Sequence, residues 1–190
     1  MAISNNSDIT SSATTVYYDN GAIHRKVSVG DQVDLLLNGT EYSFDVIGFN
    51  HDDLSSAQAY GEGTETGKAG ITLQMHELFA TFYQMNSTAS TTGGWKQSVM
   101  RGTRIPYLEG LIPENWRSIV KPVNKKTGTG GTATTGIETV EDKCFIPSHI
   151  EVFGNTNGGV VGEGQQYAYY AKGNNAAKQK IGTTISYAWW

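Results

Sequence analysis

The chain has 190 residues, a formal net charge of −4, a charged fraction of 17% and 23 glycines. A single domain with a sizeable core is the expected organisation at this length. The charge offers no basic footprint for nucleic acid, no apolar run is long enough for membrane insertion, and the polar first residues do not form a signal peptide.

The N-terminal segment, residues 1–29, is predicted to be an arm that attaches the domain to a partner. Its first half is polar and carries no apolar periodicity. Segments of this composition are ordered by a partner rather than by a core of their own. The domain itself is expected over residues 30–190.

The first strands are expected at Gln32–Leu37 and Thr40–Phe49. Between them Asn38-Gly39 suits a type I′ turn, because both central residues of that turn need positive φ. Apolar and polar side chains then alternate, which is typical of a half-buried strand, with Tyr42, Phe44 and Val46 on one face and Glu41, Ser43 and Asp45 on the other.

Short helices and loops are predicted for the rest of the chain. Residues 50–70 form a polar, Gly-bearing loop, and an apolar stripe at helical spacing predicts a helix over residues 72–85. The remaining expected elements are short helices at 95–101 and 113–120, a flexible Gly/Thr segment at 127–136, a strand running into a helical turn at 143–153, a Tyr-rich segment at 165–171 and a strand or turn at 185–190.

A His-Asp-Asp sequence opens the first long loop. Asp52 and Asp53 carry hard oxygen ligands of the kind that calcium uses, so they are candidate metal ligands. The alternative is that both carboxylates bind loop amides, the usual role of aspartates in loops. EF-hand spacing is absent and the 4 histidines show no ligand spacing. We therefore expect no bound metal and no other cofactor.

Other reactive side chains suggest no catalytic site. Lys121, Lys125 and Lys126 are expected in a solvated loop, and Cys144 is expected to be a buried small apolar residue. The sequence holds no nucleophile elbow, zinc-protease helix or phosphate-binding loop. It therefore predicts a protein that is not an enzyme.

Aromatic residues are the stronger lead, because they are numerous for so few charges. Their faces bind sugar rings and anchor protein interfaces. The candidate ligand-binding residues are Trp95, Tyr167, Tyr169, Tyr170, Trp189 and Trp190. For most of them the alternative is a place in the core.

Several segments, read together, resemble a family of unknown function that is found in gut bacterial surface proteins and in phage structural proteins. These segments are residues 44–54, 68–72, 83–88, 93–95, 100–101, 120–125 and 150–154. The resemblance extends over about residues 30–190. Family members continue past the paired tryptophans, which implies that the domain is truncated at its C-terminal end or that a neighbouring subunit covers these rings.

A looser resemblance, over residues 146–153 and the Trp-rich end, points to the C-type-lectin-like fold. It implies an α+β architecture of short strands and short helices with long Gly/Ser/Thr loops. Formylglycine-generating enzymes share such a fold, but a lone cysteine in an apolar run argues against their chemistry.

Together these resemblances imply a non-enzymatic virion module of a tail, fibre or capsid surface. Its loops would recognise a host-surface glycan or protein, its arm would bind other virion proteins, and the chain would form a homo-oligomer. The expected location is the virion surface, after synthesis in the host cytoplasm. The alternatives are a capsid or tail decoration protein with a purely structural role, and a binding domain of the bacterial cell surface.

Overall fold

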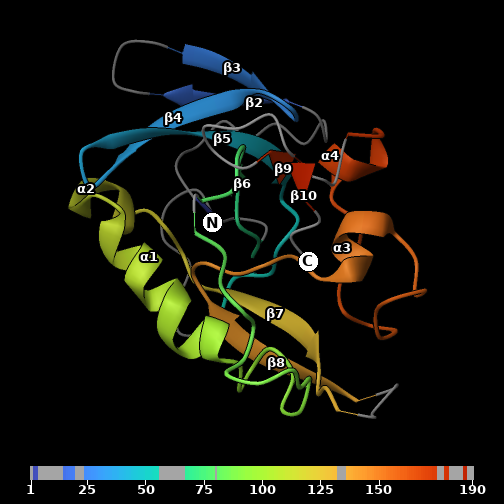
Figure 1. Cartoon of the computed structure of the whole chain (residues 1–190). Helices are drawn as coiled ribbons and strands as arrows, with labels where there is room; N and C mark the ends of the chain where they lie inside the picture. Colours follow the sequence, from blue (N-terminus) through green and yellow to red (C-terminus); the bar gives the residue numbers. More distant parts are fainter. Residues whose placement is uncertain are drawn as a thin grey trace.

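The structure is a computed structural model, and it describes residues 2–3, 15–19, 24–55, 67–79, 81–131, 136–174, 178–179 and 186–187. Its centre is a four-stranded antiparallel sheet in the order β1-β6-β5-β4 (Figure 1). The strands are β1 (Ala2–Ile3), β4 (Gln32–Leu37), β5 (Thr40–Phe49) and β6 (Ile71–Met75).

Three two-stranded antiparallel pairs accompany this sheet. They are β2 (Thr15–Asp19) with β3 (His24–Ser28), β7 (Val123–Gly128) with β8 (Ile137–Asp142), and β9 (Lys178–Gln179) with β10 (Ser186–Tyr187). Two of these strands and β1 fall in the segment predicted to be an arm. The role of that segment in attachment stays a prediction.

The helices are short and lie in two groups on opposite sides of the view in Figure 1. One group is a π-helical turn, η1 (Met100–Arg104), followed by α1 (Ile105–Leu111) and α2 (Glu114–Arg117). The other is α3 (His149–Phe153) and α4 (Ala168–Ala171). Among the described helices none is both long enough and apolar enough to cross a bilayer.

The main sheet contributes to two buried clusters. Side chains from β4, β5 and β6 pack with the ends of α1 and α2, and the buried members are Leu35, Leu37, Phe44, Val46, Leu73, Ile112 and Val120. Ile47 of β5 packs in a second cluster with α3 and α4, whose members are Val29, Ile47, Val152, Tyr167, Tyr169 and Tyr170. This mixture of short strands and short helices confirms the α+β class.

The predicted hairpin of β4 and β5 is confirmed. Asn38 and Gly39 have φ of 48° and 80°, as the tight turn requires. One part of the prediction is wrong, because Asp45 was expected at the solvent face and is buried. The second cluster covers that face of β5, and the hydroxyl of Tyr169 donates a hydrogen bond to Asp45.

The predicted helix over residues 72–85 is wrong. Its first residues form β6, which pairs with β5 on one side and with β1 on the other. Ile71 and Thr72 are β-branched and suit a strand, and pairing with two neighbours outweighs the helical spacing of the apolar residues. The described residues from 76 to 98 are irregular.

The later predictions are confirmed in part. Pro113 caps α2 and Val120 is buried, as expected. The first residues of the Gly/Thr segment expected to be flexible belong to the β7–β8 hairpin instead. No strand occurs at residues 143–148, and the helix there begins at a capping box of Ser148 with Glu151.

Candidate functional site

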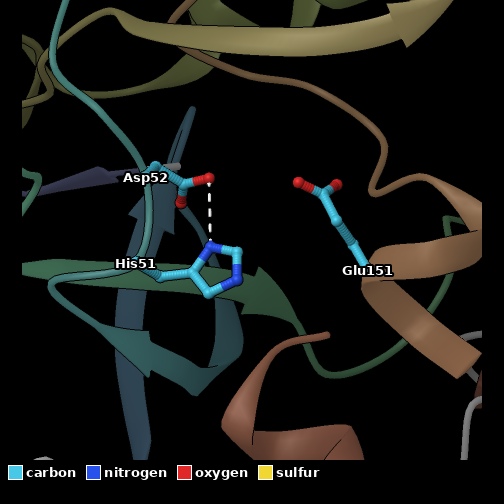
Figure 2. A group of neighbouring side chains, drawn as sticks. All are labelled: His51, Asp52 and Glu151. Atoms are coloured by element: carbon cyan, nitrogen blue, oxygen red, sulfur yellow. Dashed lines mark hydrogen bonds and ion pairs between the residues drawn. The ribbon is translucent and has the colours of Figure 1, made fainter. Parts of the chain in front are cut away.

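A cluster of charged side chains is buried where four distant segments meet. Asp52 follows β5, Lys125 lies on β7, Glu151 on α3, and Tyr167 directly precedes α4. All four are buried, and His51 lies half-buried beside them. Figure 2 shows the Asp52 and Glu151 carboxylates pointing toward one another from opposite sides, with the His51 ring beside Asp52.

Lys125 joins the two carboxylates, and its side chain is not drawn in Figure 2. Its Nζ donates to Asp52 Oδ1 at 2.9 Å, to Glu151 Oε1 and to the Tyr167 hydroxyl at 3.1 Å. An ammonium has three N–H donors, so all of them are used. The Phe145 ring lies over the ammonium, with 4.1 Å between Nζ and the ring centroid.

Asp52 receives hydrogen bonds on both carboxylate oxygens. Oδ2 accepts from Thr72 Oγ1 at 2.6 Å, and the Tyr167 hydroxyl lies 2.9 Å from Oδ1 and 3.0 Å from Oδ2. Burial alone raises the pKa of this carboxyl, but the hydrogen bond with His51 and the charge of Lys125 outweigh that effect. The pKa of Asp52 is therefore held well below its usual range.

Glu151 starts α3 and binds Lys125 with the same carboxylate. Oε2 accepts from the Ser148 amide at 2.9 Å, while Oε1 accepts from Lys125. Burial raises the pKa of Glu151, and the nearby Lys125 charge offsets this only in part. For Lys125, burial lowers the pKa, but the charges of Glu151 and Asp52 prevail and raise it.

Tyr167 forms the floor of the cluster, with no exposed surface. Its ring stacks on the His51 ring at 3.8 Å between centroids. Gly48 makes room for it, since a Cβ there would lie 3.0 Å from Tyr167 Cδ1. Burial, and then the negative charges of Glu151 and Asp52, raise the pKa of the phenol well above its usual value.

We expect Tyr167→Phe to lower the free energy of unfolding by about 1–3 kcal/mol, because Asp52 and Lys125 each lose a buried partner. Urea denaturation measures this. Tyr107→Phe is the matched control, because Tyr107 is 65% exposed and should change little. Equal effects of the two substitutions would contradict the assigned role of the Tyr167 hydroxyl.

The candidate metal ligands lie in different environments. Ligand atoms of His51, Asp52 and Glu151 lie within 4.8 Å of one another, but the Lys125 ammonium bonds to two of these residues. A metal ion would have to displace a buried positive charge. Asp53 lies outside this group and pairs with Lys68, at 2.6 Å between Oδ1 and Nζ.

We therefore expect a metal chelator to leave the melting temperature unchanged, because Lys125 already supplies the positive charge between the carboxylates. Thermal denaturation of the purified chain with and without chelator measures this. A sharp fall in the melting temperature on chelation would show that a metal ion stabilises the fold.

The tyrosines predicted to bind a ligand are buried. Tyr167, Tyr169 and Tyr170 are 0%, 9% and 5% exposed, and the Tyr170 hydroxyl donates a hydrogen bond to Gln74 Oε1. They present no exposed ring face to a sugar. Their positions agree with the alternative prediction, that these tyrosines are part of the core.

Of the predicted tryptophans, only Trp95 lies in the described part of the chain, and it is not a member of the cluster. Trp95 is half-buried, and its indole N–H donates to Asp142 Oδ2 at 2.7 Å. Trp189 and Trp190 lie outside the described residues.

Lys125 was wrongly expected in a solvated loop, and it is the centre of the cluster. Val123, Lys125 and Thr127 are the inward-facing residues of β7, spaced two apart. This alternation was the sequence signal that the Lys125 side chain faces inward. For Glu151 the signal was the spacing Ser148-x-x-Glu151, which is typical of a capping box.

An apolar cavity of about 500 Å³ opens beside β6 and α1, and two of its lining residues, Thr72 and Phe145, also contact the ion cluster. It is lined by residues that follow β6, by η1 and α1, and by residues 144–147. Three of the lining side chains lie in the irregular segment after β6 and are exposed, namely Phe82, Tyr83 and Met85. Arg104 packs its guanidinium over the Tyr83 ring, at 4.2 Å from the centroid.

The fold and the cluster define an α+β domain whose buried ion network joins its first half to its second. The chain belongs to a family described as a domain of unknown function (DUF6273), whose model matches residues 69–190. This confirms the prediction of a family of unknown function. Comparisons with curated proteins and with solved structures found no match.

Proposed function

We propose that this chain is a non-enzymatic binding module with a C-type-lectin-like fold, carried on the surface of a phage particle. Short strands and helices alternate with long irregular segments such as residues 81–98 and 154–167, which supports this fold. The setting on a particle rests on the resemblance in sequence to phage structural proteins.

The closed ion cluster is the observation that carries the non-enzymatic proposal. Lys125 forms hydrogen bonds with the Asp52 and Glu151 carboxylates and with the Tyr167 phenol, and all four side chains are shielded from solvent. Catalytic acids, bases and nucleophiles need contact with a substrate. Here the groups with reactive potential are instead joined to each other inside the fold.

The apolar cavity is the surface best suited to recognition. Most of its lining is aliphatic or aromatic, with few polar groups such as Gln74 and Glu77. Sugars need several convergent hydrogen-bonding groups, whereas apolar side chains of a protein need a dry pocket. The proposed ligand is therefore a host-surface protein.

Binding of the purified chain to host cells tests this function. Pretreating the cells with protease should abolish binding, and pretreating them with glycosidase should not. The double substitution Tyr83→Ser with Met85→Ser should weaken binding at least about tenfold, which corresponds to about 1.4 kcal/mol. Val161→Ser is the control, since Val161 is 73% exposed and lies outside the cavity lining.

The other outcomes identify the alternatives. Protease-resistant binding that glycosidase removes would indicate a glycan. Absence of cell binding, together with many regularly placed copies on the particle, would indicate a decoration protein. Turnover of a peptide thiol or a sugar substrate would contradict the non-enzymatic proposal.

A further inference from the structure

The contact between Lys125 and Asp52 places an amine beside a carboxyl group inside the protein. Nζ lies 2.9 Å from Oδ1, and the two residues are 73 positions apart in the chain. Both side chains are buried, at 5% and 3% exposure. Folding alone therefore holds an ammonium and a carboxylate, the charged forms of an amine and an acid that could condense, in contact where bulk water is excluded.

We propose that Lys125 and Asp52 condense after folding into an internal amide bond, an isopeptide crosslink between β7 and the loop that follows β5. Nζ bonds to Cγ of Asp52, and the bond from Cγ to Oδ1 breaks. Two protons leave the ammonium and join Oδ1, which departs as water. An ammonium and a carboxylate thus become one neutral amide and one water molecule.

Glu151 is placed to move these protons. Its Oε1 accepts a hydrogen bond from the same Nζ that contacts Asp52 Oδ1. A carboxylate here can take a proton from Nζ and pass it to the departing oxygen, as a general base and then a general acid.

The surroundings favour attack on Asp52. The Thr72 hydroxyl donates to Oδ2 at 2.6 Å, and the Tyr167 hydroxyl lies 3.0 Å from the same oxygen. Both can stabilise the negative charge that builds up on Oδ2 in the tetrahedral intermediate. Among the described residues, the Glu151 carboxylate accepts hydrogen bonds only from Lys125 and the Ser148 amide, so it lacks such a pair of hydroxyl donors.

The aromatic rings complete the setting. Phe145 covers Nζ, and the Tyr167 ring lies 5.5 Å from it, between centroid and nitrogen. Attack requires the neutral amine, so the Lys125 ammonium must first pass a proton to Glu151, and contact within the fold replaces a bimolecular encounter. The ion pair is the more stable starting state, so we expect condensation to be slow and to follow folding.

Mass spectrometry of the denatured, purified chain tests the proposal. After prolonged incubation of the folded protein, the measured mass should be lower than the mass calculated from the sequence by one water molecule. Protease digestion should yield a branched peptide that joins Lys125 to Asp52. A full-mass chain, a bond from Lys125 to Glu151, or water loss confined to one peptide (a cyclic imide at an aspartate) would each overturn it.

Three variants sharpen this test. Asp52→Asn should form the same amide but lose ammonia instead of water. Glu151→Gln should keep its full mass while circular dichroism shows a native fold, because the proton carrier is gone. Lys126→Met, next to the reactive lysine and exposed, should still lose one water molecule. A crosslink in Glu151→Gln at the wild-type rate would overturn the role given to Glu151.

Discussion

Replacing Lys125 with methionine should lower the free energy of unfolding by about 3–5 kcal/mol, the cost of breaking a buried ion pair from one side. The Asp52 and Glu151 carboxylates would then face one another without the positive charge that bonds to both. Their remaining hydrogen bonds do not neutralise two buried negative charges. Urea denaturation followed by circular dichroism measures the loss.

Lys126→Met is the matched control for this prediction. It makes the same chemical change one residue further on, where the side chain is exposed, and we expect a change within about 0.5 kcal/mol. Adding Asp52→Asn and Glu151→Gln to Lys125→Met should recover part of the loss, since no charge would then stay buried. A Lys125→Met chain as stable as the control would contradict the role of the cluster.

Alkaline pH should unfold the protein through the same cluster. The pKa of Lys125 is raised above its ordinary 10.5, and that of Tyr167 lies well above its ordinary 10.0. Both groups hold their protons more tightly in the folded chain than in the unfolded chain. Their contribution to stability is fully present below those ordinary values, and it is lost as the pH rises through the folded pKa values.

The free energy of unfolding should therefore fall from about pH 10 upward, and urea midpoints measured across this range check it. Tyr167→Phe should make the decline shallower. Tyr107→Phe should not, because its exposed phenol has no buried partners. In chains that carry the proposed amide, Lys125 has no amine to titrate and Tyr167 causes the decline. Stability that is constant through this pH range would contradict both pKa directions.

Local signals in the sequence predicted the local parts of the fold. The Asn38-Gly39 turn and its strands were predictable because turn geometry and alternation act over a few residues. The start of α2 directly after Pro113 had a similar local cause. By contrast β6 was mistaken for a helix, because its strand state depends on partners β5 and β1, which no short window of sequence contains.

The site was predictable only in outline. Asp52 was a candidate because of its residue type and loop position, but two of its partners, Lys125 and Tyr167, lie 73 and 115 residues further along the chain. Lys125 looked like a solvated lysine, because a charged side chain is almost never fully buried unless it is paired. Its pairing is a property of the tertiary structure, and local periodicity alone could only have marked it as facing inward.

The cluster also defines how much of the chain must fold as one cooperative unit. The family model begins at residue 69, so its span includes Lys125, Glu151 and Tyr167 but leaves out Asp52. It also leaves out β5, the central strand that contributes to both buried clusters. We therefore expect the cooperative folding unit to be larger than the matched region. A fragment confined to residues 69–190 would lack one of the two carboxylates that neutralise its buried lysine.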